Sequence, residues 1–225
     1  MWRERRRRDI AAVQERDAAA RSKIEIALLY NGVKAVRAHR RANWLYRHGL
    51  RFWARAVSQR CVRRTGIEIH PAAVIGDGLF IDHGVGVVIG ETAEIGQNCT
   101  LYQGVTLGGT GKDKGKRHPT LGDNVLVGAG AKVLGPITIG NNVKIAAGAV
   151  VLDNIPDNCT AVGVPARVVR RCGKRTDALD QVHIPDPVAQ ELCRMQTRLE
   201  ALEKQLNLLR GVPEDGTAAE AEREG

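Results

Sequence analysis

The sequence predicts a mainly β fold, a left-handed parallel β-helix, and three observations support this prediction. An aliphatic residue recurs every six positions through the middle of the chain, glycine often follows it, and small residues cluster between the repeats. A period of six fits neither an amphipathic helix nor a free-standing strand, but it matches the hexapeptide repeat of a β-helix. The repeating positions form three runs: Ile69, Ile75, Ile81 and Val87; Ile89, Ile95, Leu101 and Leu107; and Leu121, Val127, Val133, Ile139, Ile145 and Val151.

This pattern describes a triangular prism. Three hexapeptides make one coil, a side of the coil spans roughly 20 Å, and coils stack roughly 4.8 Å apart, so the aliphatic side chains point inward and form ladders. Hexapeptide helices wind left-handed, an exception to the usual handedness of parallel crossovers. We expect the β-helix over residues 66–170, interrupted once by the polar, glycine-rich segment 108–119. Because this segment breaks a regular coil, we expect it to serve a purpose other than forming the coil.

Helices are predicted before the repeats, over residues 1–65. Residues 9–30 are rich in Ala, Glu, Arg and Leu, and a second helical stretch runs from Val33 to about Arg64. Asn31-Gly32, between these stretches, has the composition of a helix stop. We expect these helices to cap the β-helix.

The chain after the repeats is predicted to contain a linker, a helix and a tail. The linker is residues 171–187. Residues 188–210 carry apolar side chains at heptad a and d positions, which favours a self-associating coiled-coil helix, with packing against the same chain as the alternative. Residues 211–225 are small, acidic and aperiodic, and we expect them to be disordered.

The composition indicates a cytoplasmic protein with no membrane partner. The 225 residues are 43% hydrophobic and 26% charged, which suits one globular domain with appendages. No stretch reaches the roughly 18 apolar residues of a membrane span, and the arginine-rich segment 3–8 lacks the apolar part of a secretion signal. Five cysteines without a Cys-x-x-Cys pair indicate buried, reduced thiols.

The net charge of +9 raises the question of a nucleic-acid partner, since clustered arginines neutralise phosphates. Aromatic residues make up only 4% of the chain, and no nucleic-acid recognition fold is visible. We therefore expect the arginines to cover helix faces, attract anionic substrates or form solvated termini, and we expect no nucleic-acid partner.

The candidate chemistry begins at Asp82-His83-Gly84, where a regular repeat would place small or neutral residues. Glu68 precedes His83 by fifteen residues, close to one coil length, so both are expected on adjacent rungs near one corner. A carboxylate that orients an imidazole supports a general base, and an imidazole pKa of about 6.5 suits neutral pH. Arg117-His118 in the interrupting segment would add a cation and a second imidazole. From the residues alone, an inert solvent-facing histidine stays open as the alternative.

The chain resembles the bacterial serine O-acetyltransferases over about residues 10–170. The Asp-His-Gly, Gly-Gly-Thr-Gly and Arg-His-Pro elements, in this order, separate the serine enzymes from other hexapeptide acyltransferases. The stretches that carry the resemblance are IEIHPAA at 67–73, IDHGVGVVIGET at 81–92, QGVTLGGTG at 103–111, RHP at 117–119, VGAGAKVLG at 127–135 and VGVPAR at 162–167.

The resemblance implies transfer of the acetyl group of acetyl-CoA to the hydroxyl of L-serine. The products would be O-acetyl-L-serine and CoA, the first step of cysteine biosynthesis, with no metal. His83 would be the general base that takes the hydroxyl proton as the oxygen attacks the thioester directly. Glu68 stands where several members have aspartate, so the supporting carboxylate is kept but is one methylene longer.

The resemblance also implies a clamp around the amino acid. Asp82, Arg117 and His118 match residues that hold the serine ammonium and carboxylate, and arginine offers two parallel donors to a carboxylate. Asp17 matches an N-terminal aspartate that reaches the serine amino group, with a helix-surface salt bridge as the alternative.

Acetyl-CoA in this family lies in a groove between neighbouring β-helices and is contacted largely by backbone groups. The matching positions are Gly108, Gly109, Ala129 and Ala147, with Lys132 nearby; an ordinary solenoid corner is the alternative for each of them. A groove between copies implies a homotrimer at least.

Two features bear on larger assemblies. The N-terminal helical segment of about 65 residues is shorter than that of longer members, so a hexamer stays open. The sequence ends Glu222-Arg223-Glu224-Gly225, without the terminal isoleucine through which members bind O-acetylserine sulfhydrylase, so that complex is not expected.

Three rival functions are less consistent with the sequence. An acetyltransferase for a sugar or antibiotic acceptor would not need Asp82 and Arg117 to clamp an amino acid. A γ-class carbonic anhydrase holds zinc with three histidines, two of them about five residues apart, and His70, His83 and His118 are too widely spaced. A non-catalytic scaffold leaves Asp82-His83 and the segment 108–119 unexplained.

Overall fold

The structure is a computed structural model that describes residues 2–111 and 114–169, together with residues 195, 198, 199, 201, 202, 205 and 206. The chain forms two compact units, Met1–Pro185 and Asp186–Gly225. The described residues of the second unit are helical. The predicted linker 171–187, the tail 211–225 and most of the predicted helix 188–210 lie outside the described residues.

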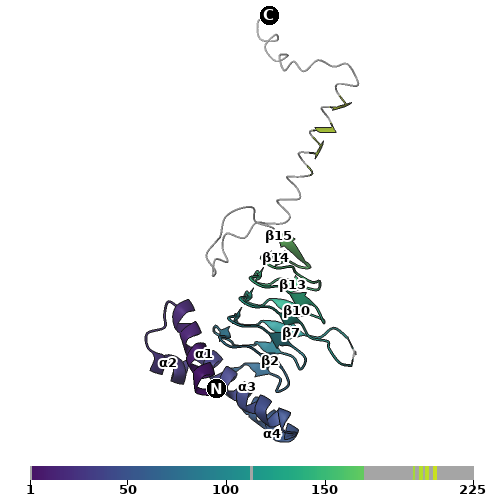
Figure 1. The fold of residues 1–225 in the computed structure, drawn as a ribbon. Coiled ribbons are helices and arrows are strands. Elements are labelled where there is room, and N and C mark those ends of the chain that lie inside the picture. The colour runs from purple at the N-terminus through teal and green to yellow at the C-terminus, as the bar shows by residue number, and fades with distance from the viewer. Residues whose placement is uncertain are drawn as a thin grey trace, which may run out of the picture. The chain divides into compact units, whose positions relative to one another are not determined.

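Residues 2–65, all of which the structure describes, form four helices: α1 (Trp2–Arg16), α2 (Lys23–Leu29), α3 (Asn31–Arg47) and α4 (Arg51–Thr65). The helices lie beneath the first coil of the β-helix (Figure 1). The apolar side chains Ala35 and Val36 of α3 join the same buried cluster as the interior of the β-helix. These contacts confirm the predicted cap.

The predicted helix break at Asn31-Gly32 lies one to two residues late: α2 ends at Leu29, Tyr30 separates the helices, and Asn31-Gly32 begin α3. A second break interrupts the stretch predicted as helical from Val33 to about Arg64. It falls at residues 48–50, where Gly49 has a φ of 81°, the left-handed conformation in which helices commonly end. Gly32 serves close packing: a Cβ at this position would collide with the carbonyl oxygen of Ile81. Composition alone does not separate a glycine that ends a helix from one that permits contact.

Fifteen short strands in the described residues form three sheets, and their stacked coils are visible in Figure 1. The strands pair in parallel except for β14 and β15, which pair antiparallel. The first sheet contains β1 (Glu68–Ile69), β4 (Val88–Ile89), β7 (Thr106–Gly108), β10 (Lys132–Leu134) and β13 (Val150–Val151). The second contains β2 (Val74–Ile75), β5 (Glu94–Ile95), β8 (Thr120–Leu121) and β11 (Thr138–Ile139). The third contains β3 (Phe80–Ile81), β6 (Thr100–Leu101), β9 (Leu126–Val127), β12 (Lys144–Ile145), β14 (Thr160–Gly163) and β15 (Ala166–Val169).

The register locates two coils that are longer than the regular one. Val88 pairs with Thr106, eighteen positions on, which is the regular coil length. Glu68 pairs with Val88, twenty positions on, so the first coil has two extra residues. Glu94 pairs with Thr120, twenty-six positions on, so a later coil has eight extra. The first insertion lies in the turn that contains Asp82-His83-Gly84, and the second is the predicted interruption after β7.

The fourteen aliphatic positions predicted to point inward are all buried. In the second sheet, for example, Ile75 lies over Ile95 and Ile95 over Leu121, so one ladder runs up each side of the prism. Because each rung buries the same kind of side chain, the repeat supplies its own core. This arrangement confirms the predicted parallel β-helix.

The cysteines of the described region are free thiols, as predicted. Cys99 and Cys159 are buried and Cys61 is half-buried, whereas Cys172 and Cys193 lie outside the described residues. Burial raises the pKa of Cys99 to about 11. Among the helices that the structure describes, none is long and apolar enough to span a bilayer.

Candidate active site

The predicted site residues lie at two corners of the β-helix. The turns from the third sheet to the first, which we name the His83 corner, contain residues 82–87, 102–105, 128–131 and 146–149. The turns from the first sheet to the second, which we name the His118 corner, contain residues 70–73, 90–93, 109–111 with 114–119, and 135–137. Strand β4 connects the two corners in one coil.

His83 lies in the left-handed conformation, with a φ of 57°, and Gly84 follows with a φ of 77°. The other non-glycine residues with positive φ in the described chain are all asparagines, which tolerate this conformation well. The tight turn is closed by the Gly84 N–H, which donates to the Asp82 carbonyl at 2.6 Å. A histidine held in a backbone conformation of this kind points to a functional role.

The imidazole of His83 projects outward from this turn, and 74% of its side-chain surface is exposed. Its Nε2 lies 3.9 Å from Oδ1 of Asp82, which is the ionic neighbour that the structure records for it. A base with this exposure is accessible to a substrate hydroxyl.

Asp17, in the turn after α1, reaches the same corner from the helices. Its Oδ1 accepts the Ala19 N–H at 2.8 Å, and its Oδ2 accepts the Tyr30 hydroxyl at 2.8 Å. The hydrogen bond to Asp17 raises the pKa of Tyr30 to about 12, with burial and the negative charges of Asp17, Glu25 and Asp82 adding to the shift. Asp17 and Asp82 therefore both act electrostatically on Tyr30.

A small second core positions this group. Phe80 in β3 points away from the interior of the β-helix and is 2% exposed, because Val13, Ile26 and Val33 from α1, α2 and α3 cover it. Tyr30 packs against the same cluster. Burying an aromatic ring of this size stabilises the docked helices, and the docking places Asp17 near Asp82.

Glu68 is tied to the His83 corner through its backbone. Its N–H donates to the Val87 carbonyl at 2.8 Å, and in the same turn the Gly86 N–H donates to the Gly66 carbonyl at 2.9 Å. The carboxylate, however, forms an ion pair with Arg55 of α4, at 3.5 Å between Oε1 and Nη2. The backbone lies on the predicted rung, while the predicted contact between the Glu68 and His83 side chains stays a prediction.

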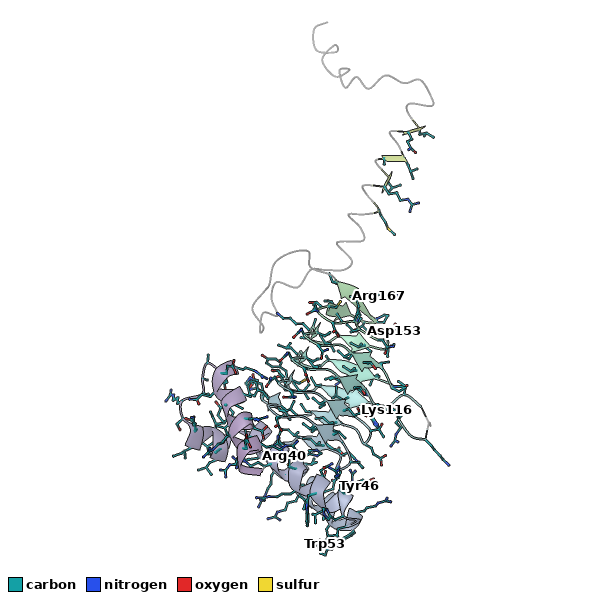
Figure 2. All side chains as sticks on the ribbon, in the orientation of Figure 1. Arg40, Tyr46, Trp53, Lys116, Asp153 and Arg167 are labelled. Carbon is teal, nitrogen blue, oxygen red and sulfur yellow. The ribbon has the colours of Figure 1, made fainter. Side chains whose placement is uncertain are left out.

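Thr92 organises the His118 corner. Its hydroxyl oxygen accepts the N–H groups of Arg117 at 3.0 Å and of His118 at 3.1 Å, and it contacts His118 Nδ1 at 2.9 Å. Lys116 adds hydrogen bonds to the Thr92 carbonyl at 2.8 Å and to the Glu94 carboxylate at 2.9 Å. Figure 2 shows Lys116 where the interrupting loop rejoins the stack. These bonds close the long loop onto the preceding coil.

The contact between the closed loop and Thr92 sets the tautomer of the His118 ring. The Thr92 N–H donates to Nδ1 at 3.2 Å, so Nδ1 acts as an acceptor and the neutral ring carries its hydrogen on Nε2. Burial lowers the pKa of His118, and the positive charge of Arg117 lowers it further. The ring also lies against Gly90, where a Cβ would collide with it. His118 is therefore suited to donate a hydrogen bond.

Arg117 is paired with the Glu91 carboxylate. This hydrogen bond lowers the pKa of Glu91. The pair leaves Arg117 partly exposed, with other donors of the guanidinium available to an anionic ligand.

The positions predicted for acetyl-CoA divide between the two corners. Ala129 and Ala147 lie in the His83 corner, two and three coils beyond His83, and the Gly148 N–H donates to the Ala129 carbonyl at 2.8 Å. Gly108 ends β7 and Gly109 follows it beside the backbone of Arg117. Lys132 lies between the corners in β10, and its Nζ donates to the Gly104 carbonyl and to Thr106 Oγ1.

The structure adds site residues that the sequence did not single out. Thr92 and Glu91 hold His118 and Arg117, Tyr30 holds Asp17, and Arg55 holds Glu68. Glu91-Thr92 ends the IDHGVGVVIGET stretch, so its place in that stretch was a usable signal. In the described residues, no group of three or more His, Cys, Asp or Glu side chains could hold a metal ion.

Comparison with known proteins finds one matching family and several similar proteins. Residues 118–153 match the family described as bacterial transferase hexapeptide (six repeats). The chain is 54% identical over 198 residues to a serine acetyltransferase of Synechococcus elongatus, covering 88% of this chain and 81% of that protein. It is 52% identical over 208 residues to a serine acetyltransferase of Bacillus subtilis, covering 92% and 93%.

A solved structure agrees with both relatives. Soybean serine acetyltransferase complexed with serine superimposes with a TM-score of 0.73 at 49% identity, covering 74% of this chain and 69% of that one. The likeness confirms the predicted left-handed form of the β-helix. Because its relatives are more than half identical to it over at least four fifths of their length, the chain belongs to the serine acetyltransferase family.

Proposed function

We propose that this protein transfers the acetyl group of acetyl-CoA to the hydroxyl of L-serine, giving O-acetyl-L-serine and CoA, the first step of cysteine biosynthesis. The observation that carries the proposal is the exposed imidazole of His83, held in a left-handed turn beside Asp82. Family membership, and the serine bound to the soybean relative, support serine as the acceptor.

His83 is the proposed general base. Its neutral ring takes the proton of the serine hydroxyl while the oxygen attacks the thioester carbonyl, so the C–O bond forms as the carbonyl becomes an oxyanion. The tetrahedral intermediate then collapses, the C–S bond breaks, and the imidazolium returns the proton to the leaving CoA sulfur. Glu68 is the proposed partner that favours the imidazolium, supported by its backbone bond to the same turn.

The proposed serine clamp uses both corners. Asp82 and Asp17 supply negative charge for the ammonium group at the His83 corner. Arg117 and the neutral His118 supply donors for the carboxylate at the His118 corner. Hydrogen bonds to a charged carboxylate are about twice as strong as neutral ones.

One copy of the chain does not close this clamp. The corners are separated by one side of the prism, roughly 20 Å, which is several times the length of serine. We therefore propose that each site forms between the His83 corner of one copy and the His118 corner of the next, in a homotrimer. A hexamer stays open.

Acetyl-CoA is the proposed co-substrate, bound in the groove between copies. The division of its predicted contacts supports this placement, since Ala129 and Ala147 belong to one corner and Gly108 and Gly109 lie toward the other. Small residues leave room for the pantetheine arm, and backbone N–H groups can stabilise the oxyanion. Lys132 is the proposed nearby cation.

The test is CoA release from acetyl-CoA by the purified protein, comparing L-serine with homoserine, threonine and a sugar acceptor. Release with L-serine alone is the expected result. Release that favours another acceptor would keep His83 as the base but overturn the substrate. No release with any acceptor would overturn the enzymatic proposal and favour a scaffold.

A further inference from the structure

Helices α3 and α4 enclose a pocket of about 380 Å³ that lies outside both corners of the candidate active site. The helices are joined by the short turn 48–50 and pack along each other. The volume lies within the range of small-molecule sites, roughly 300 to 1,000 Å³. Its position on the helices separates it from His83 and His118.

The charged side chains that line this pocket are all cationic. Residues three or four positions apart share one face of a helix, and this spacing brings two basic stripes together across the pocket. No carboxylate in the described residues lies within ion-pair distance of any of the five. From α3 they are Lys34, Arg37 and Arg41, and from α4 they are Arg60 and Arg64.

The side chain of Arg37 shows that gathering cations in this pocket costs free energy. Its Nε and Nη2 are buried and have no hydrogen-bond partner among the described residues. Burial lowers the pKa of Arg37, the charges of Arg6 and Arg41 lower it further, and the charge of Asp9 in α1 acts in the opposite direction. A buried donor without a partner costs about 1 to 3 kcal/mol, and more when it is charged.

Some other arginines of the described first unit are paired with carboxylates. Arg40 donates to Asp9 at 2.8 Å, Arg5 and Arg8 pair with Asp77, and Arg55 pairs with Glu68. In each of these pairs the fold supplies a carboxylate from another part of the structure. In the α3–α4 pocket it supplies none, which leaves the positive charge for a ligand.

We propose that the α3–α4 pocket binds a small anion that carries two or more phosphate groups. Five cations require a multiply charged ligand, and the planar guanidinium matches phosphate oxygens in pairs. The volume of the pocket suits a small molecule. The ligand is an inorganic phosphate chain or the phosphate chain of a nucleotide, whose base would lie on the apolar wall formed by Ala38 and Val57.

The proposal is tested by titration calorimetry on the full chain, in about 150 mM salt and without acetyl-CoA or serine. The probes are tripolyphosphate, ATP and sulfate. We expect tripolyphosphate to bind once per chain and at least about tenfold more tightly than sulfate, because it engages more of the cations. ATP binding more tightly than tripolyphosphate assigns a nucleotide, and equal affinity assigns the phosphate chain alone.

Variants separate the pocket from the general positive charge of the chain. Arg37→Gln and Arg64→Gln should each weaken tripolyphosphate binding about tenfold or more, since each removes a charge-assisted hydrogen bond. The matched control is Arg63→Gln, which removes an exposed charge of the same helix outside the pocket and should stay within about twofold. Arg64 is exposed, so Arg64→Gln keeps the test valid if Arg37→Gln fails to fold.

Two results would overturn the proposal: no binding of either polyphosphate at millimolar concentration, or equal weakening by Arg63→Gln and Arg37→Gln. A thermal unfolding scan gives a second readout, because a ligand of the folded state raises Tm. Neither measurement uses acetyl transfer, so the outcome is independent of the proposed function.

Discussion

His83 illustrates how one backbone conformation serves chemistry. Four asparagines occupy left-handed positions elsewhere in the described chain, and at this position a histidine takes that conformation. The turn exposes the imidazole while Asp82 stays beside it. At the other corner, burial and the Thr92 N–H keep His118 neutral. The two histidines thus have different surroundings, in agreement with the different roles proposed for them.

Replacing His83 separates its chemistry from its backbone role. We expect His83→Asn to lower kcat by roughly 10²- to 10⁴-fold, the range for losing a general base. The melting temperature should be unchanged, because asparagine tolerates the left-handed turn. Steady-state kinetics and thermal unfolding check this outcome. His83→Ala is the comparison and should lose activity and some stability; near wild-type turnover in His83→Asn would remove His83 from the role of base.

His39 in α3 makes stability depend on pH. Burial lowers its pKa from 6.5 to about 4, and the charge of Arg40 adds to the shift. Because the folded chain binds this proton more weakly than the unfolded chain, the contribution is complete above pH 6.5 and is lost as the pH falls toward 4. Between pH 7.5 and 5 the expected loss is about 2 kcal/mol.

The check is urea unfolding of wild type and His39→Gln at both pH values. The variant lacks the titrating ring, so its stability should change less over this interval. An identical pH dependence in the two proteins would show that His39 does not contribute to it.

At the scale of elements, the N-terminal helices act as part of the candidate site. Phe80 is covered by side chains from α1, α2 and α3, and Gly32 lets α3 approach the backbone of β3. The same docking sets Tyr30 and Asp17 near Asp82. Serine binding is therefore expected to respond to changes in helix packing that do not touch the substrate.

Gly32→Ala tests this link. A methyl group there would collide with the Ile81 carbonyl oxygen, so α3 must shift, at a cost of about 1 to 3 kcal/mol. We expect the KM for serine to rise while the KM for acetyl-CoA changes little, because the predicted acetyl-CoA contacts lie in later coils. Denaturant unfolding and steady-state kinetics provide the two measurements.

Gly49→Ala is the matched control. No atom lies within 4 Å of a Cβ built at Gly49, but its φ of 81° is left-handed, so alanine should cost about 1 to 2 kcal/mol through backbone strain alone. Its KM for serine should match wild type. Equal changes of KM in both variants would disconnect serine binding from the docking of α3.

At the scale of the whole molecule, the two corners imply a site shared between copies. His83 precedes β4 and the residues around His118 follow it, so the prism itself keeps them apart. The proposed homotrimer is the arrangement that would bring them together. This inference makes activity depend on assembly.

Mixed oligomers test the shared site. His83→Asn and Arg117→Ala should each be inactive alone, and trimers formed from an equal mixture should recover activity at about one quarter of the sites. The measurement is CoA release after joint refolding or co-expression, with the separate variants as controls. No recovery in proven mixed trimers would place the whole site within one copy.

The β-helix, its two lengthened coils and the motif residues could be predicted from the sequence alone. A six-residue repeat identifies the inward-facing positions from neighbouring residues alone. The buried aliphatic positions from Ile69 to Val151 could therefore be assigned without knowing any long-range contact. The phase shift after Val87 and the polar segment 108–119 marked the insertions that carry His83 and His118. The four motif residues Asp82, His83, Arg117 and His118 were readable because each lies in such an insertion.

The contacts that support these residues could be seen only once the chain was folded. The role of Gly32 is to let α3 approach the carbonyl of Ile81, and the bonds from Tyr30 to Asp17 and between Thr92 and His118 join segments distant in sequence. Arg55 takes the carboxylate of Glu68, and two basic stripes meet across α3 and α4. Such contacts depend on how coils and helices pack in space, which a local repeat does not encode.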